Sequence, residues 1–409
     1  MALLTGGSDK PYVFGLTMSL LSQGFEIDMI GSEELDLPEF RNRLGLRLLK
    51  LRGSQHSDAR IVEKMGRICS YYAKLIKYAV TANAEIFHIL WNNRFETFDR
   101  TVLMALYRAL GKKVVLTAHN VNAGKRDGRD GILNRATLKV QYRLAHKIFV
   151  HTEKMKEELA ADFDVSGDRV AVIPFGINNS VPQTDLTPSE AKLRLGLADH
   201  EKAILCFGRI TPYKGIEYLI GAFRQLLEKD KFYRLIIGGR VDQCEDYWRT
   251  IRNGIKDEIK RGQAIVRDEF VPDGETEAYF KGADVLVLPY TEIYQSGVMF
   301  LGQSFGLPII AADVGSFKEE IEEGRNGFVF RSRDVDDLAR TIARYFSSNL
   351  YINLNQKRRE IRDRATKTHS WDVVGQITAS TYSHLCSAAS DRRSVPEISS
   401  PPLEEDRAS

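Results

Sequence analysis

The sequence has few cysteines, and they do not group. The 409 residues contain four, spread along the whole length: Cys69, Cys206, Cys244 and Cys386. They form no C-x-x-C pair, and no histidine completes a metal cluster with them. This spacing excludes a disulfide-stapled fold and a zinc module. We therefore predict reduced thiols and a cytoplasmic location.

Long apolar runs and a strong net charge are also absent. No apolar run approaches the roughly 18 residues of a membrane-spanning helix, and the N-terminus has no signal-peptide pattern. The 58 Lys and Arg nearly balance the 55 Asp and Glu, giving a net charge of +3. So small an excess gives no reason to expect nucleic acid as a partner.

A dinucleotide fingerprint is missing as well. Neither glycine-rich turn of the chain forms G-x-G-x-x-G followed by an acidic residue for a ribose. That absence makes an NAD-dependent oxidoreductase a poor reading. No pair of carboxylates is placed to hold a divalent cation, so we expect a protein that works without a metal cofactor.

What is present indicates a two-domain α/β protein. Apolar residues make up 43% of the chain, and strand-like runs alternate with helix-like segments along most of it. Such alternation predicts parallel sheets, here in two Rossmann-like, doubly wound halves that face a central cleft. We place an N-terminal domain at 1–178, a C-terminal domain at 179–350, returning helices at 351–386 and a disordered tail at 387–409. The irregular segment from Phe175 to Pro188 is the predicted interdomain linker.

The first candidate site lies in the stretch from Leu205 to Leu227. A buried strand turns through Gly208 and Gly215, with Arg209 and Lys214 between them, and continues as an apolar-faced helix. The carboxyl end of a strand and the amino end of a helix favour an anion, and two cations strengthen that preference. A phosphate or diphosphate is the natural ligand. The alternative is a pair of cations on a solvated loop.

A second helix start follows the strand that ends at Pro289. The sequence Gln295-Ser296-Gly297-Val298 opens an apolar helix there, so the N–H groups of residues 296–298 would form another anion site. Because this helix start also follows a strand, we expect it to lie at the same sheet edge as Arg209 and Lys214. Two helix starts and two cations at one crevice suit a diphosphate better than a single carboxylate.

The N-terminal half offers three groups at predicted strand ends. Gly6 and Gly7 follow the first strand, Trp91 and Asn92 follow a later one, and His119 and Asn120 end the next. Parallel sheets bind ligands at such ends. A plain tight turn and a structural histidine remain the alternatives. The segment 121–131, which contains Lys125, Arg126 and Arg129, reads as a mobile polar loop.

Basic residues cluster around the apolar run from Leu46 to Leu51: Arg41, Arg43, Arg47, Lys50 and Arg52. They could give a weak peripheral contact with an acidic membrane surface. A solvated face is the favoured reading, because no long amphipathic helix accompanies them.

Several of these motifs resemble family 4 retaining glycosyltransferases, which have the two-domain GT-B fold. They are FGRITPYKGIEYLI, VLPYTEIYQSGVMFLGQSFGLPIIAADVGSFKEEI and NGFVF in the second half, and GGSDKPYVFGL, TAHN and VIPFGIN in the first. The order of the motifs covers most of residues 1–385. The resemblance implies transfer of a sugar from a nucleotide-diphosphate donor to an acceptor hydroxyl, with retention at the anomeric carbon.

The resemblance also assigns roles to residues. Arg209, Lys214 and residues Ser296, Gly297 and Val298 would bind the donor diphosphate, and Gly6 and Gly7 would back the phosphates or the acceptor. His119 would contact the transferring sugar. Trp91, Asn92 and Asn120 would lie on the acceptor side, where a glycan, glycolipid or small molecule enters.

One part of the family pattern is missing. Many members carry two glutamates eight positions apart, the second of them on the nucleotide ribose. Here the second position is Leu301 or Gly302, and Glu292 lies near the first but out of register. Other members share QSG in place of that pattern. We retain Glu292 as a catalytic candidate beside His119, Arg209 and Lys214.

Two further readings stay open. The same scaffold could support a hydrolase, an epimerase or a phosphorylase, because a fold does not fix a reaction. The missing ribose glutamate also leaves room for a catalytically silent protein that binds nucleotide sugars.

Overall fold

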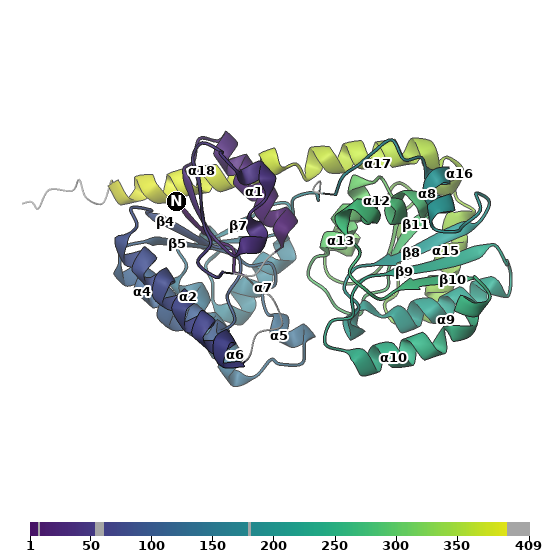
Figure 1. Cartoon of the computed structure of the whole chain (residues 1–409), viewed down its shortest axis with the longest axis horizontal. Coiled ribbons are helices and arrows are strands. Elements are labelled where there is room, and N and C mark those ends of the chain that lie inside the picture. The colour runs from purple at the N-terminus through teal and green to yellow at the C-terminus, as the bar shows by residue number, and fades with distance from the viewer. Residues whose placement is uncertain (7–8, 54–60, 179–180, 391–409) are drawn as a thin grey trace, which may run out of the picture.

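The computed structural model describes residues 1–6, 9–53, 61–178 and 181–390. Figure 1 shows two lobes side by side, each built on a parallel sheet with helices on both faces. This is the predicted α/β architecture of two doubly wound domains.

The first lobe contains a seven-stranded sheet in the order β3-β2-β1-β4-β5-β6-β7. Its strands are β1 (Ala2–Leu4), β2 (Ile27–Ile30), β3 (Leu46–Leu49), β4 (Ile86–Ile89), β5 (Lys113–Thr117), β6 (Lys147–Val150) and β7 (Val170–Val172). Its longer helices are α1 (Lys10–Ser22), α2 (Ile61–Thr81), α6 (Ile132–Leu144) and α7 (Glu153–Phe163), with the short α3 (Glu96–Phe98), α4 (Met104–Ala109) and α5 (Ala123–Arg126). β1 and β4 are buried throughout, as strands covered on both faces must be.

The second lobe contains a six-stranded sheet in the order β10-β9-β8-β11-β12-β13. Its strands are β8 (Lys202–Phe207), β9 (Tyr233–Gly238), β10 (Ala264–Arg267), β11 (Val285–Leu288), β12 (Ile309–Ala312) and β13 (Gly327–Phe330). Its helices are α8 (Pro188–Arg194), α9 (Ile216–Leu227), α10 (Glu245–Gly254), α11 (Lys256–Lys260), α12 (Asp273–Gly282), α13 (Gly297–Ser304), α14 (Phe317–Glu320) and α15 (Val335–Phe346). Each of these strands overlaps one of the strand-like runs in the C-terminal half of the sequence.

The C-terminal segment, predicted as returning helices at 351–386, consists of three helices. They are α16 (Asn349–Ile352), α17 (Leu354–Thr368) and α18 (Trp371–Ser390). In Figure 1, α17 runs along the second lobe and α18 lies against the first. Residues 387–390 therefore belong to α18, while the predicted disordered tail from 391 on lies outside the described residues.

Very close helix packing fixes α18 on α1. A Cβ placed on Gly15 would meet the Trp371 ring at 1.9 Å, and one on Gly375 would meet Ser19 Oγ at 1.9 Å. Ser19 also donates a 2.6 Å hydrogen bond to the Trp371 carbonyl. Only glycine permits this approach, so the two glycines hold the returning helix in place.

Two chain segments connect the lobes, and they lie side by side. The segment after β7 contains Ile177, whose N–H donates to the His369 carbonyl at 2.8 Å. Trp371 Nε1 donates to the Ile177 carbonyl at 2.9 Å. The predicted linker is thus paired with the junction between α17 and α18. Its residues 179 and 180 lie outside the described residues.

Candidate active site

The loops after the two central strand pairs face each other across the lobes. In the first sheet the strand order reverses between β1 and β4, and in the second it reverses between β8 and β11. Open α/β sheets bind ligands at such switch points, where loops part to either side. Gly6 and Trp91 follow β1 and β4, and Gly208 and Pro289 follow β8 and β11.

Glycines let the chain close tightly at both switch points. Gly6 has a φ of +61°, and a Cβ there would lie 2.1 Å from the Trp91 carbonyl oxygen. Gly215 has a φ of +63°, and its Cβ would lie 2.1 Å from the Pro289 carbonyl oxygen. A side chain fits at neither position. Gly7, the other predicted turn residue, lies outside the described residues.

Lys214 is a buried cation. Its side chain is 7% exposed, and its Nζ lies 3.8 Å from the centre of the Tyr290 ring and within hydrogen-bond reach of the Tyr290 hydroxyl. Burial, with smaller contributions from the Arg209 and Arg126 charges, lowers the pKa of Lys214 to about 7. No carboxylate neutralises it in an ion pair among the described residues. Such a cation lacks only an anionic partner.

Arg209 presents the second cation differently. Its side chain is 69% exposed, and Nη1 contacts Asp242 Oδ2 at 3.1 Å. Asp242 follows β9, so the strand beside β8 positions the guanidinium. The structure therefore places both predicted cations at one sheet edge, one buried and one at the surface.

The start of α13 completes this edge. Ser296 is the N-cap residue, is 4% exposed, and lies 3.4 Å from the Tyr290 hydroxyl through its Oγ. Val298 packs on Gly208, because a Cβ on that glycine would come within 2.9 Å of Val298 Cγ2. Tyr290 thus connects Lys214 with Ser296. The predicted helix start and the predicted cations are joined by a residue that the sequence did not single out.

Gln295 is a further residue at this edge. Both polar atoms of its side-chain amide are buried, and neither has a hydrogen-bond partner among the described residues. Buried amides are normally satisfied, and exceptions call for an explanation such as a ligand.

The residues at the two glutamate positions of the family pattern differ in burial. Glu292 lies exposed on the loop before α13, close enough to Arg126 for the charges to interact. Leu301 is 6% exposed and packs in the core of the second lobe. Leu301 therefore has no polar atom to offer a ligand, and Glu292 stays a candidate.

His119 sits in a cage of rings at the opposite edge. Trp91 stacks on it with ring centres 4.2 Å apart and planes 5° apart, and Tyr12 meets it edge-on at 4.6 Å. Its Nδ1 lies 3.0 Å from Nε2 of His151, which follows β6. Burial is the main reason that the pKa of His119 is well below its usual value, so the ring is neutral at pH 7.

The three acceptor-side candidates have different surroundings. Trp91 supports His119, and Asn120 lies half-buried beside it. The Asn92 amide instead exchanges hydrogen bonds with Gln141 on α6, at 3.1 and 3.4 Å. Since both atoms of that amide already have partners, Asn92 is better placed to fix α6 than to bind a ligand.

Contacts from the segment 121–131 cross the cleft. This segment was predicted to be a polar loop, but it contains the helical turn α5, and the Arg126 guanidinium lies 4.7 Å from the centre of the Tyr213 ring in the second lobe. Nearby, the Tyr294 hydroxyl donates to Glu158 Oε1 at 2.8 Å, and Lys125 Nζ contacts the same oxygen at 2.8 Å. These contacts join the lobes beside Lys214.

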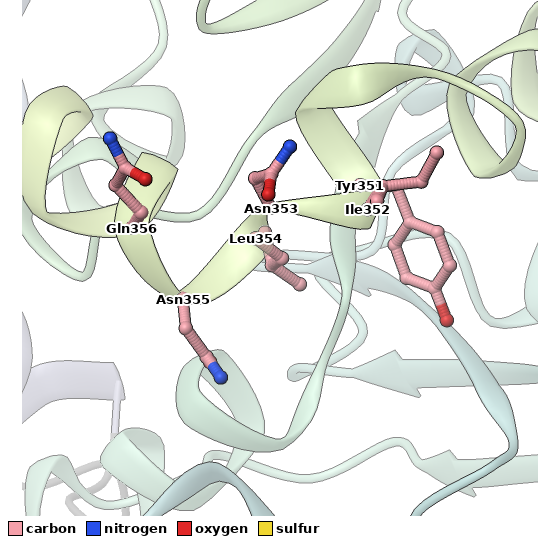
Figure 2. Close-up of a pocket in the computed structure, with 6 residues that line it drawn as sticks. All are labelled: Tyr351, Ile352, Asn353, Leu354, Asn355 and Gln356. Carbon is pink, nitrogen blue, oxygen red and sulfur yellow. The ribbon is translucent and has the colours of Figure 1, made fainter.

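A separate hollow lies at the junction of α16 and α17 (Figure 2). The residues that line it are Tyr351, Ile352, Asn353, Leu354, Asn355 and Gln356. Figure 2 shows the amide groups of Asn353, Asn355 and Gln356 pointing in different directions. None of these residues follows a strand end, so the hollow contributes nothing to the site between the lobes.

Two broader observations concern metals and membranes. Over the described ranges, no group of three or more His, Cys, Asp or Glu side chains is arranged to hold a metal ion. Nor does any described helix combine the length and apolar character needed to cross a bilayer.

The basic cluster of the first lobe is largely paired. Arg47 contacts Asp28 at 2.5 Å, while Arg41 and Lys50 contact Asp36 at 3.3 and 2.7 Å. Those carboxylates offset much of the positive charge, which favours the solvated face over the membrane contact.

Sequence reasoning assigned no role to Tyr290, Asp242, Gln295 or His151. Three of them stand directly or almost directly after a strand: Tyr290 after β11, Asp242 after β9 and His151 after β6. Applying the strand-end rule to every strand would have found these three. The buried state of Gln295 and Lys214 has no sequence signal.

Both halves of the chain match known glycosyltransferase families. The family described as Glycosyl transferases group 1 matches residues 201–348, and Glycosyltransferase Family 4 matches residues 11–181. An uncharacterized glycosyltransferase of Methanocaldococcus jannaschii is 26% identical over 381 residues, covering 90% of this chain and 92% of that protein. A D-inositol 3-phosphate glycosyltransferase of Corynebacterium efficiens is 27% identical over 253 residues, which span 60% of this chain and 58% of the relative.

Solved structures share the fold. Sucrose-phosphate synthase from Thermosynechococcus elongatus superposes with a TM-score of 0.76 at 17% identity, over 95% of this chain and 99% of that one. Anabaena HepE in complex with UDP and glucose gives a TM-score of 0.70 at 17% identity, over 93% and 99%. At 17% identity, these similarities show a shared fold and nothing about the substrate.

Proposed function

The chain belongs to the glycosyltransferases of group 1 and family 4, with the GT-B fold, and we propose that it transfers a sugar with retention from a nucleotide-diphosphate donor to an acceptor hydroxyl. The observation that carries the donor assignment is the buried Lys214 at the switch point of the second sheet, where no carboxylate of the described residues pairs with it. A solved neighbour of the same fold, HepE of Anabaena, binds UDP-glucose, which supports a nucleotide sugar as the ligand class.

Lys214, Arg209 and the N-terminus of α13 together form an anion cradle. During transfer, the bond between the anomeric carbon and the diphosphate breaks, and negative charge grows on the leaving oxygen. Cations and helix N–H groups aimed at that oxygen stabilise the transition state more than the ground state. They take the place that a divalent cation occupies in other phosphate sites, so the reaction proceeds without a metal.

The first lobe supplies the sugar and acceptor side. His119, held by Trp91 and Tyr12, also faces the Phe175 ring at 6.3 Å between centres, and a Cβ on Gly297 would lie 4.0 Å from that same ring. Retention requires the acceptor oxygen to approach the face that the diphosphate leaves. The acceptor therefore enters beside His119 and Asn120, between the lobes, as a glycan, a glycolipid or a small hydroxylated molecule.

A thermal-shift screen against nucleotide sugars tests the ligand class. A ligand that binds only the folded state raises the unfolding temperature by mass action, so the true donor should stand out among bases and sugars. Product analysis by NMR then reads the anomeric configuration of the new bond. The proposal fails if no nucleotide sugar or nucleoside diphosphate shifts the unfolding temperature.

Measuring turnover and products distinguishes a transferase from a hydrolase and from a catalytically silent binding protein. A transferase releases nucleoside diphosphate faster when the acceptor is present and yields a glycosylated product. A hydrolase yields free sugar whether or not an acceptor is there, and a silent binder shifts in temperature without turnover.

A further inference from the structure

His119 and His151 form a hydrogen-bonded pair at the carboxyl ends of neighbouring strands. His119 follows β5 and His151 follows β6, and the two strands pair in parallel. His119 Nδ1 and His151 Nε2 are 3.0 Å apart. His151 is 5% exposed, and its ring also contacts Phe175 at 5.0 Å between centres.

The backbone determines which nitrogen of His151 carries the proton. His151 Nδ1 lies 3.3 Å from the carbonyl oxygen of Ile173, and a carbonyl can only accept. His151 Nδ1 is therefore the donor in that contact. In the neutral ring, Nε2 must then hold a lone pair.

The assignment passes from His151 to His119. Because His151 Nε2 is an acceptor, His119 Nδ1 must donate to it. The remaining nitrogen, His119 Nε2, is then an acceptor as well. Burial lowers the pKa of His151 to about 4 and that of His119 well below its usual value, so both rings are neutral near pH 7.

His119 Nε2 is the one atom of this pair without a partner. It is buried and forms no hydrogen bond with any described residue. A buried acceptor left unsatisfied destabilises the fold, so such an atom points to a missing ligand group. The group must be a donor, and a hydroxyl fits while a phosphate oxygen does not.

We propose that His151 is a positioning residue that keeps the His119 proton on Nδ1, so that His119 Nε2 accepts a hydrogen bond from a hydroxyl of the transferring sugar or of the acceptor. The hydroxyl's identity rests on the proposed function, whereas the tautomer does not. His119 then distinguishes hydroxyl groups from anions at the first lobe's edge of the cleft. Removing a residue that orients a functional histidine commonly lowers activity by about 10- to 100-fold.

Two substitutions at position 151 separate hydrogen bonding from packing. His151→Gln keeps an acceptor oxygen for His119 and a donor for Ile173, while His151→Phe keeps a ring and removes the acceptor. His200→Gln is the control, because His200 is exposed and lies beside Phe232, away from the pair. Thermal unfolding checks that each variant is folded.

NMR of histidine-labelled protein near pH 7.5 reads the tautomer directly, with the His119 signal assigned from its absence in His119→Ala. We expect the Nδ1–H form in the wild type and in His151→Gln, and a shift toward the Nε2–H form in His151→Phe. An Nε2–H or charged His119 in the wild type overturns the inference, even if His151→Phe does not fold.

Kinetics with the donor found by screening provide the second readout. We expect kcat/KM to fall ~10- to 100-fold in His151→Phe and to stay within a few-fold in His151→Gln. A loss of affinity for the nucleotide sugar alone assigns the hydroxyl to the transferring sugar, and a rise in the acceptor KM alone assigns it to the acceptor. An equal loss of nucleoside diphosphate affinity contradicts the proposal.

The two proposals can fail separately. A wild type with the Nδ1–H tautomer but no transferase activity would reject the proposed function and support the histidine pair. An active wild type whose His119 carries its proton on Nε2 would do the reverse.

Discussion

Lys214 combines a charge with nearly complete burial. Burial beneath Tyr290 lowers its pKa from 10.5 to about 7, so the free protein holds it partly neutral at physiological pH. A bound diphosphate favours the charged form and raises that pKa again. Donor binding should therefore be coupled to uptake of a proton above pH 7.

The affinity for nucleoside diphosphate should weaken as the pH rises from 7 toward 9. The sign follows because the free site loses its proton in this range while the bound site keeps it, and the limit is about tenfold per pH unit. Calorimetry in buffers of different ionisation enthalpy measures the proton uptake. Lys214→Met should abolish it without lowering the unfolding temperature, because it removes an unpaired buried charge. A pH-independent affinity in the wild type would contradict the assignment.

Arg209→Ala should reduce transfer about 100-fold while leaving the unfolding temperature nearly unchanged. The guanidinium is exposed and would act on charge that grows in the transition state. Arg249→Ala is a matched control, because Arg249 is 70% exposed and its guanidinium pairs with Asp246 at 2.9 Å within α10. Equal activity in the two variants would remove Arg209 from the site.

Side chains at strand ends were predictable, but their environment was not. The rule that places ligands at the carboxyl ends of parallel strands located His119, Arg209 and Lys214. It gave no indication that Lys214 is buried and Arg209 exposed, because the burial of Lys214 depends on Tyr290, which lies 76 positions later, after the neighbouring strand β11. Asn92 fits the same rule, yet its amide is used by Gln141.

At the scale of single elements, α18 is attached to the first lobe through a buried polar chain. His88 on β4 contacts the Tyr382 hydroxyl at 2.5 Å through Nδ1 and Thr117 at 2.7 Å through Nε2. All three side chains are buried. Their loss should therefore be expensive, although none of them lies in the cleft.

Tyr382→Phe should lower the free energy of unfolding by about 1–3 kcal/mol, because it leaves His88 Nδ1 buried without a partner. Ser383→Ala on the same helix is the control, since Ser383 is exposed and bonds only within the helix. Urea denaturation of both variants gives the comparison. A Tyr382→Phe protein as stable as the control would show that α18 is held by apolar packing alone.

Acid should destabilise the fold through the same histidine. Burial lowers the pKa of His88 to about 3, so between pH 6.5 and 3 the unfolded chain binds a proton that the folded chain does not. Stability is lost as the pH falls, by about 2 kcal/mol at pH 5 for this group. Urea denaturation at pH 7 and pH 5 should show a smaller acid effect in His88→Gln than in the wild type. An equal acid effect in both would contradict the assignment.

The strands of the second lobe could be predicted from the sequence, whereas the break between α17 and α18 could not. The strands of the second lobe follow continuous apolar runs, and the structure confirms each of them. The break between α17 and α18 has no proline or glycine at its centre, so the sequence pattern did not show where one helix ends and the next begins. The break is imposed by tertiary contacts, since His369 and Trp371 hydrogen-bond to the linker at Phe175 and Ile177.

For the whole molecule, the repeat of two doubly wound halves was visible in the alternation of strands and helices, and the motifs fixed the family. The contacts that join the halves, Arg126 with Tyr213 and Tyr294 with Glu158, were not. They join residues remote in sequence, whose proximity only the folded chain reveals.

Transfer should survive removal of divalent cations. The cradle of Lys214, Arg209 and α13 already supplies positive charge to the leaving diphosphate. We expect unchanged turnover in excess EDTA, measured as nucleoside diphosphate release. A loss of activity that magnesium or manganese restores would show that the cradle is incomplete.

The division of labour between the lobes is the central claim, and calorimetric titration of nucleoside diphosphate tests it most directly. The wild type, Lys214→Met and His119→Ala are titrated with the nucleotide identified in the donor screen. We predict that Lys214→Met weakens binding ~10- to 100-fold, as loss of a charged hydrogen bond does, and that His119→Ala binds like the wild type. Wild-type affinity in Lys214→Met, or an equal loss in His119→Ala, would contradict the claim.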